Sequence, residues 1–209
     1  MNNAIKSRTL KLVITAVMTA LTCVVTVYVN IPNGVGGNIN IGDSLIFISA
    51  SLLGALPAAF IGGIGSMIAD FVGGYAAFAP FTLIVKGLEG LVAGLVSYYA
   101  FNLESKNRLS GIARILLTIG GMIAAALVMT LGYFVTSLIL NNGMIKTALT
   151  ESVGNLIQGA ISVVVASVAV FVARLDTVAK RYLYVCKYPQ DKSEDKDNEG
   201  REDDIDRDI

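Results

Sequence analysis

The chain has 209 residues, of which 54% are hydrophobic and only 15% are charged, and its mean hydropathy is +0.66. Soluble domains carry about 25% charged residues, so this composition excludes most soluble enzymes and predicts an integral membrane protein with several spanning helices. There is no histidine and no GxxxxGK[ST] phosphate-binding loop, so any ATP hydrolysis must come from a partner. We therefore expect no enzyme activity, no cofactor and no metal site.

Charge is unevenly distributed along the chain. Residues 187–209 hold five basic and ten acidic residues, which leaves eleven basic and six acidic residues for the remainder. A strongly charged stretch with few apolar residues is typical of disorder. We expect a cytoplasmic N-terminus (1–11), a membrane domain (12–176), and a basic and then acidic cytoplasmic tail (177–209) that is largely disordered.

A basic N-terminal segment precedes the first apolar run, which covers residues 12–29. The run ends in polar residues and not at a small-x-small cleavage site, so we expect a retained spanning helix and no cleaved signal peptide. Within it, Ala16 and Ala20 share one face and allow another helix to approach closely. That helix could belong to the same protein or to a partner.

The segment 30–42 is rich in glycine and asparagine and contains one proline, which predicts a loop. Its length suits a segment that covers a binding site, although a flexible surface loop has the same composition. As a covering segment it would offer three amide side chains to a ligand, those of Asn33, Asn38 and Asn40.

Residues 43–73 are compatible with one long kinked helix or with a helical hairpin that turns near residues 54–57, which include Gly54 and Pro57. The basic residues decide between them, because short loops rich in Lys and Arg stay in the cytoplasm. The N-terminus and segment 102–114 are both basic, so an even number of spans must separate them. We therefore predict two short helices, at 43–55 and 57–73.

The remaining apolar runs predict three more spans, at 80–101, 112–140 and 150–175, with outer loops at 74–79 and 141–149. The predicted fold is an all-α integral membrane protein with six transmembrane helices. Both termini are expected in the cytoplasm, and the membrane is expected to be the plasma membrane of a bacterial cell.

Three of the predicted helices carry polar residues at helical spacing in otherwise apolar sequence, so the polar side chains of each helix share a face. The three sets are Thr82, Lys86 and Glu89; Thr130, Tyr133 and Ser137; and Glu151, Asn155, Gln158 and Ser162. An ionised residue at the bilayer centre costs about 2.5–3.5 kcal/mol on insertion scales. Lys86 and Glu89 therefore need a ligand or an internal partner.

The polar faces of the three helices are predicted to lie at a similar depth in the membrane. At 1.5 Å per residue, Lys86, Tyr133 and Gln158 all lie roughly 9–12 Å below the outer ends of their helices. We expect one outward-facing cavity beneath the two outer loops. Its candidate substrate-binding residues are Asn33, Asn38, Asn40, Tyr75, Phe78, Lys86, Glu89, Tyr133, Asn155 and Gln158. The alternative is an interhelical hydrogen-bond network without a ligand.

Two further acidic residues are given structural roles. Asp43 is expected to cap the N-terminus of the helix that begins there. Asp70, near the outer end of its helix, is expected to fix the neighbouring loop. The cavity itself offers amide, carboxylate, ammonium and phenol groups with aromatic rings, which suits a small polar molecule with a flat ring.

Several segments are shared with one transporter family: residues 65–75 (GSMIADFVGGY), 80–82 (PFT) and 86–91 (KGLEGL), together with Ala16 and Ala20. In these segments the chain resembles the substrate-binding S components of energy-coupling-factor (ECF) vitamin transporters, over about residues 8–176. The resemblance implies six helices with cytoplasmic termini and a vitamin bound near the outer face beneath the first loop. It implies that the alanine pair contacts a transmembrane T subunit, which couples to two cytoplasmic ATPase subunits. It further implies that the S component topples in the membrane to release its substrate inside.

Within that family, segment 64–91 is most similar to the branch associated with hydroxymethylpyrimidine, pyridoxine and riboflavin-type substrates. The chain has no tryptophan, which argues against thiamine. The resemblance thus implies a high-affinity binding subunit for pyridoxine or hydroxymethylpyrimidine, with riboflavin next. The alternative is a stand-alone secondary transporter of a small polar metabolite, coupled to protons through Lys86, Glu89 or Asp70.

Overall fold

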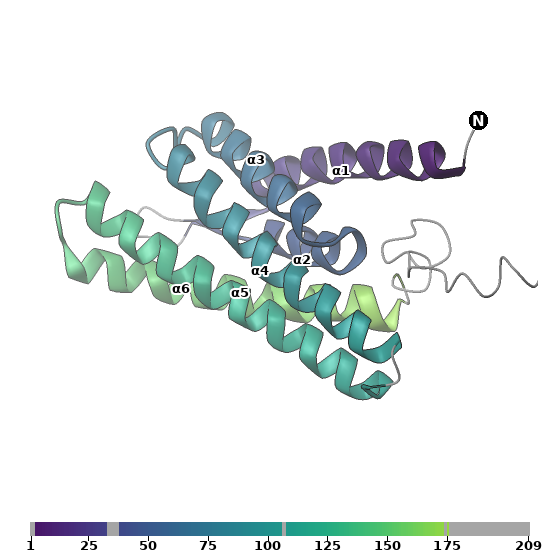
Figure 1. Ribbon diagram of the computed structural model, residues 1–209. Helices are drawn as coiled ribbons and strands as arrows, with labels where there is room; N and C mark the ends of the chain where they lie inside the picture. Colours follow the sequence, from purple (N-terminus) through teal and green to yellow (C-terminus); the bar gives the residue numbers. More distant parts are fainter. Residues whose placement is uncertain (1–2, 33–37, 106–107, 174, 176–209) are drawn as a thin grey trace, which may run out of the picture.

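Six α-helices make up most of the chain that the computed structural model describes, which is residues 3–32, 38–105, 108–173 and 175. The helices are α1 (Asn3–Tyr28), α2 (Gly42–Leu53), α3 (Ala55–Gly73), α4 (Ala79–Ser105), α5 (Gly111–Leu140) and α6 (Ile145–Ser167), and α6 continues into a π-helical turn, η1 (Val168–Val172). Between α1 and α2, strands β1 (Asn30–Pro32) and β2 (Asn38–Asn40) pair antiparallel, with Ile31 opposite Ile39. The six helices run alternately in opposite directions (Figure 1).

Five helices are long and apolar enough to cross a membrane, and α2 is not. The 12 residues of α2 extend only about 18 Å at 1.5 Å per residue, against a hydrocarbon core about 30 Å thick. Because α2 packs against α1, α3, α4 and α6 and is mostly buried, it needs no spanning length. The six predicted helices are present, but only five of them are candidate membrane spans, and α2 is a short, mostly buried helix.

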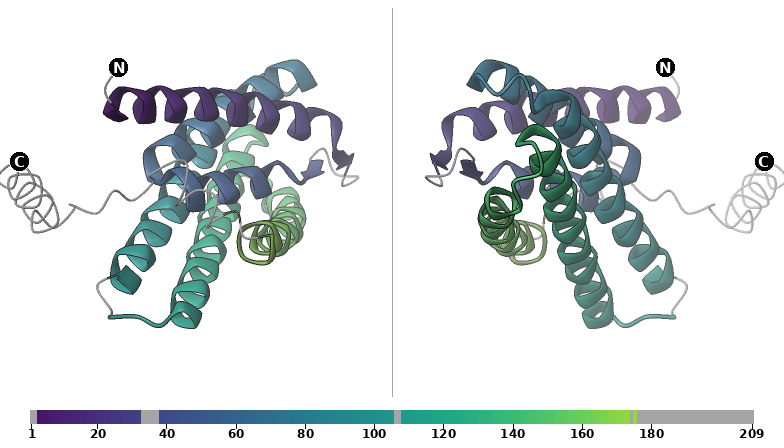
Figure 2. Two further views of the ribbon diagram at one scale, coloured as in Figure 1. Left: turned by 90° about the vertical axis from the view of Figure 1, so that its right-hand side faces the viewer. Right: turned by 90° about the vertical axis from the view of Figure 1, so that its left-hand side faces the viewer.

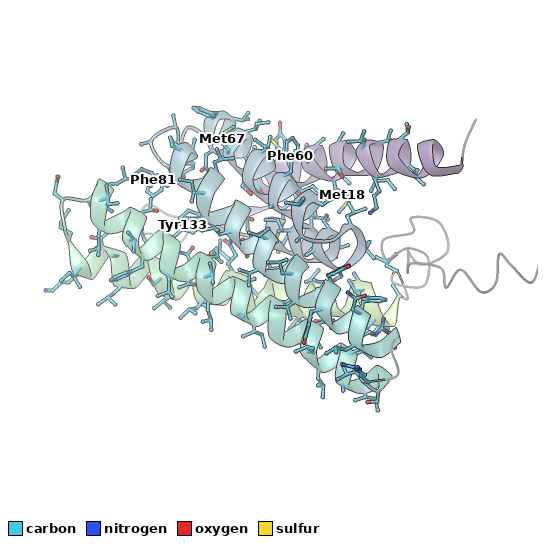
Figure 3. All side chains as sticks on the ribbon, viewed as in Figure 1. Met18, Phe60, Met67, Phe81 and Tyr133 are labelled. Carbon is cyan, nitrogen blue, oxygen red and sulfur yellow. The ribbon has the colours of Figure 1, made fainter. Side chains whose placement is uncertain are left out.

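Large apolar side chains cover the outer sides of the long helices, as expected for surfaces that face lipid. Figure 3 shows side chains projecting outward around the whole molecule. Exposed leucine, isoleucine and valine residues are found on α1, α4, α5 and α6. The buried core is built instead mainly from alanines, such as Ala125, around a few larger residues such as Phe47 and Met122.

The region 43–73 folds as a hairpin and not as one kinked helix. Gly54 separates α2 from α3 with a φ of 86°, a conformation that glycine adopts far more readily than other residues. As a result, the start of α1 and the α4–α5 connection lie at the same end of the molecule (Figure 1). Four helices, α1 to α4, separate the two basic segments as predicted, although α2 is too short to be a full span. The cytoplasmic assignment of that end stays a prediction. The predicted tail, 177–209, lies outside the described residues.

Two loop predictions were wrong in part. The segment 30–42 is not only a loop, since β1 and β2 form its two sides. The predicted outer loop 141–149 is much shorter, because α6 begins at Ile145. Asn142 and Gly143 both have positive φ, 51° and 81°, and this left-handed pair ends α5 and lets the next helix start directly.

α3 and α4 pack with their backbones in close contact. A Cβ atom on Gly62 would lie 2.5 Å from the carbonyl oxygen of Lys86, and one on Gly90 would clash with the backbone of Ala58. Small residues at a crossing point allow membrane helices to approach in this way. The glycines therefore hold the part of α4 that carries the charged residues directly against α3.

We expect Gly90→Ala to destabilise the fold by about 1–3 kcal/mol, because the added methyl group overpacks the α3–α4 contact. The matched control is Gly120→Ala on α5, where an added Cβ would meet no atom within 4 Å. The control should be neutral or slightly stabilising, since alanine is the better helix former. The thermal midpoints of the purified proteins in detergent measure both, and equal midpoints would contradict the packing described here.

Candidate functional site

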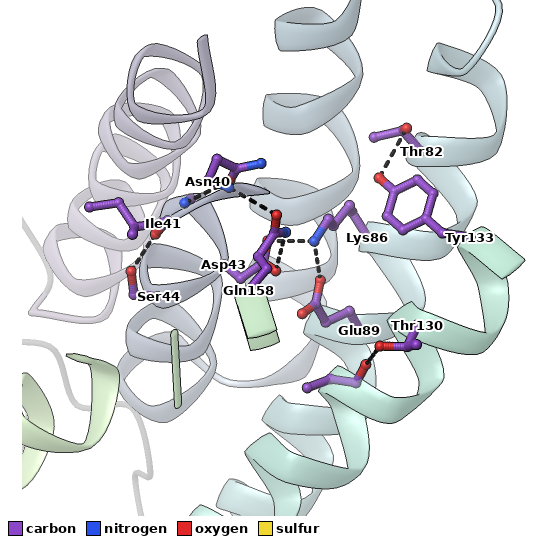
Figure 4. A network of polar contacts seen from close by, with 12 residues as sticks. Asn40, Ile41, Asp43, Ser44, Thr82, Lys86, Glu89, Thr130, Tyr133 and Gln158 are labelled. Atoms are coloured by element: carbon purple, nitrogen blue, oxygen red, sulfur yellow. Dashed lines mark hydrogen bonds and ion pairs between the residues drawn. The ribbon is translucent and has the colours of Figure 1, made fainter. Parts of the chain in front are cut away.

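Lys86 lies at the centre of a group of buried polar side chains inside the helical bundle (Figure 4). Its ammonium nitrogen makes an ion pair with Asp43 Oδ1 from α2 and lies 3.0 Å from Glu89 Oε2 on its own helix. Lys86, Asp43 and Glu89 are only 3%, 1% and 0% exposed. Ionised groups so deeply buried require mutual compensation, and the three side chains supply it to one another.

Gln158 of α6 extends this group toward β2. Its Nε2 donates to Asp43 Oδ2 at 2.7 Å, and its Oε1 accepts from the backbone N–H of Asn40 at 2.9 Å. One chain of contacts thus joins β2, α6, α2 and α4. These five residues, Asn40, Asp43, Lys86, Glu89 and Gln158, are called the buried polar network below.

Asp43 is a member of the buried polar network that the sequence did not place there. The prediction that it caps α2 was wrong: the N-cap position is Ile41, without a side-chain cap, and Asp43 lies in the first helical turn with its carboxylate on Lys86. The N-terminus of a helix favours negative charge, so α2 itself helps to hold this carboxylate. An aspartate just before an apolar helix fits a cap or an ion pair equally well, and the sequence pattern alone does not separate them.

Tyr133 of α5 adds a branch to the network. Its ring centroid lies 5.6 Å from Lys86 Nζ, within the range of a cation–π contact. Its hydroxyl donates to Thr82 Oγ1 at 3.1 Å. Asp70, predicted to fix the neighbouring loop, accepts from the N–H of Tyr75 through its backbone carbonyl at 2.7 Å, and the role of its carboxylate stays a prediction.

The structure brings four of the ten predicted binding side chains together: Lys86, Glu89, Tyr133 and Gln158. Lys86, Tyr133 and Gln158, which were predicted to lie at similar depth on three helices, do meet in one cluster. Two other members of the polar sets, Thr130 and Ser137, form hydrogen bonds within their own segment. Thr130 donates to the carbonyl of Ala126, and Ser137 accepts from Asn141.

Of the remaining predicted binding residues, Asn40 belongs to the network through its backbone N–H, while its side chain accepts from the N–H of Gly42 at the start of α2. No hydrogen bond or ion pair among the described residues joins the others to the network. Tyr75 and Phe78 lie in the turn between α3 and α4, and Asn155 is half-buried on α6. Asn33 and the side chain of Asn38 lie outside the described residues.

Ala16 and Ala20 lie on the side of α1 that the rest of the protein leaves open. Both are exposed, and their neighbours on that side include Val13, Val17 and Val24. The opposite side of α1 packs against α2 and α3. Figure 2 shows α1 along one side of the molecule, away from α5 and α6. This pair therefore does not pack a helix within the described chain.

The chemistry available at the network is hydrogen bonding and charge recognition. It offers carboxylates, an amide, an ammonium group and a phenol ring inside an apolar bundle. No group of three or more His, Cys, Asp and Glu side chains in the described residues is arranged to hold a metal ion. Such a site can select a small molecule by its polar groups.

A family model and one of two similar proteins are described as transport proteins. Residues 6–175 match the family model described as "ECF-type riboflavin transporter, S component". The chain is 40% identical over 111 residues to a Pyrococcus woesei protein described as "Uncharacterized protein in gap 3'region". This match covers 53% of this chain and 66% of that protein. It is 34% identical over 94 residues to the thiamine precursor transporter HmpT of Lactococcus lactis subsp. cremoris (strain MG1363), covering 44% of this chain and 57% of that protein. The matches thus span less than two thirds of either relative.

We expect Lys86→Met to destabilise the protein by about 3–5 kcal/mol, because it leaves the carboxylates of Asp43 and Glu89 buried without their counter-charge. The matched control is Lys146→Met near the start of α6, where the lysine is exposed, and its effect should stay within about 0.5 kcal/mol. Thermal unfolding in detergent compares the two variants. A Lys86→Met protein as stable as the control would show that the buried charges do not depend on one another.

Proposed function

The chain belongs to the family of S components of ECF-type riboflavin transporters, and from this premise we propose that it is the substrate-binding subunit of an ATP-driven importer. The family is one of integral membrane transport subunits and not of enzymes. The observation that carries the proposal for this chain is the buried polar network. It places recognition groups from α2, α4 and α6 at one point inside an apolar bundle.

The substrate that we propose is a small water-soluble vitamin or vitamin precursor with a flat heterocyclic ring. Hydroxymethylpyrimidine and pyridoxine are favoured, and riboflavin is next. The similarity to a transporter named for a thiamine precursor supports the first of these, and the family description supports riboflavin. The polar character of the network suits the smaller rings, which carry several hydrogen-bonding groups for few ring atoms.

In this proposal Lys86, Glu89, Tyr133 and Gln158 bind the substrate, with Tyr133 available to stack on its ring. Asn155 would contribute from the preceding turn of α6. The segment around Asn33, Asn38 and Asn40 and the turn with Tyr75 and Phe78 would close over the substrate from outside. Substrate would enter from the outer face and leave inside when the subunit topples in the membrane.

The proposed partners are a transmembrane T subunit and two cytoplasmic ATPase subunits. The open face of α1 around Ala16 and Ala20 suits the T subunit, since small residues four apart let another helix approach closely. Neither residue has a packing role that would compete with such a contact, because both are exposed.

A second candidate function is a stand-alone secondary transporter coupled to protons. The observation that favours it is the presence of two buried acids, Asp43 and Glu89, on one lysine, since intramembrane acids often form proton relays. The two functions differ in their energy source.

We expect vesicles that contain this chain alone to bind but not accumulate substrate. Accumulation should require the T subunit, both ATPase subunits and internal ATP, and it should survive collapse of the proton gradient. Radiolabelled hydroxymethylpyrimidine, pyridoxine and riboflavin are the probes, and mass spectrometry of the small molecule that co-purifies identifies the natural one. Accumulation driven by a proton gradient without ATP would establish the secondary transporter instead.

Replacement of both alanines by phenylalanine (Ala16→Phe with Ala20→Phe) should abolish uptake by the complete complex and leave substrate binding by the purified chain unchanged. Two bulky rings would hold the T subunit away from α1, while the buried polar network lies elsewhere. Ala124→Phe, on the exposed face of α5, is the matched control and should preserve uptake. Loss of binding in the double variant would refute the assignment of this face to docking.

A further inference from the structure

The carboxylate of Glu89 has hydrogen-bonding capacity that the described residues do not use. Its Oε2 forms an ion pair with Lys86 Nζ at 3.0 Å, but neither Oε1 nor Oε2 has a hydrogen-bond partner among the described residues. The whole side chain is 0% exposed. Most buried side-chain polar atoms in proteins are hydrogen-bonded, so this carboxylate calls for a donor that the described residues do not supply.

Lys86 is in the opposite situation, because protein groups surround it. Asp43 and Glu89 contact its ammonium group, and the Tyr133 ring lies over it. Asp43 is itself held on its second oxygen by Gln158. The contacts of Lys86 are therefore structural ones that fix its position, and they fix the Glu89 carboxylate through it.

Formal charge at this place is also unbalanced. Two carboxylates, those of Asp43 and Glu89, share the single ammonium group of Lys86. On α3, Asp70 Oδ2 is also buried without a hydrogen-bond partner among the described residues. An excess of carboxylates in a low-dielectric interior favours a ligand that brings hydrogen-bond donors or positive charge, and it opposes a phosphorylated ligand.

We propose that the Glu89 carboxylate recognises an N–H donor on the substrate, and that Asp43 acts as a positioning residue that holds Lys86, and through it Glu89, for this contact. The substrate class is then a non-phosphorylated heterocycle with an exocyclic amino group, such as a 4-aminopyrimidine. Riboflavin carries no such amino group. This inference rests on the proposed binding function and assigns separate roles to Lys86 and Glu89 within it.

The test is the affinity ratio for two probes, 4-amino-5-hydroxymethyl-2-methylpyrimidine and the same pyrimidine without its amino group. Isothermal titration of the purified full-length chain measures both. The unmodified chain is expected to bind the amino compound about 10- to 100-fold more tightly, the value of a hydrogen bond to a charged group. In Glu89→Gln this preference should largely disappear. The phosphate monoester of the amino compound should bind at least tenfold more weakly than the free alcohol.

Two further variants separate contact from positioning. Asp43→Asn should weaken both pyrimidines by a similar factor and leave their ratio near that of the unmodified chain. Glu104→Gln makes the same substitution farther along α4, where the glutamate pairs with Arg114, and it should change neither affinity. Thermal midpoints of all variants establish that they are folded, and Glu89→Asp, which keeps the charge, should retain part of the preference if Glu89→Gln proves unstable.

Each outcome decides the matter. An unchanged preference in Glu89→Gln, or a preference lost in Asp43→Asn and kept in Glu89→Gln, overturns the assignment of Glu89. Tight binding of riboflavin with no binding of either pyrimidine overturns the substrate class and leaves the proposed importer function standing. If the chain binds neither pyrimidine, pyridoxine nor riboflavin, the proposed function itself fails and this inference fails with it.

Discussion

The ion pair between Lys86 and Asp43 is the contact on which the interior of this protein depends. It joins α4 to a helix that is too short to cross a membrane, and it places one positive and one negative charge where neither is stable alone. Because Gln158 also holds Asp43, and Asn40 holds Gln158, the same pair connects the first outer strands to the last helix. Removing it would release three segments that are far apart in the chain.

That constraint explains the unusual shape of the α1–α3 region. Irregular backbone and helix ends are tolerated at membrane depth only where protein surrounds them. The start of α2 satisfies this condition, with α1, α4 and α6 packed around it. Its N-terminus then provides a favourable field for Asp43. The glycine contacts between α3 and α4 complete the arrangement, because they let α3 lie close enough to cover the face of α4 beside Lys86.

Much of this could be predicted from the sequence, and the rest could not for definite physical reasons. Apolar runs and basic loops predicted the alternating helices and the hairpin at Gly54, since both depend on local composition. Helical spacing and depth predicted that Lys86, Tyr133 and Gln158 meet, because each residue of an α-helix advances by a fixed rise of about 1.5 Å. Asp43 could not be assigned, because its role depends on where α2 lies relative to α4. The pairing of β1 with β2 depends likewise on a few backbone contacts that composition does not encode.

The spare hydrogen-bonding capacity of the network bears on the two interpretations that the sequence left open. A network that serves only to hold helices together is most stable when every donor and acceptor is paired, because each unpaired buried group lowers stability. Glu89 adds a second carboxylate on the lysine that already pairs with Asp43, and neither of its oxygens has a hydrogen-bond partner among the described residues. A purely structural network gains nothing from such a residue, which supports the proposal that Glu89 receives a donor from a ligand.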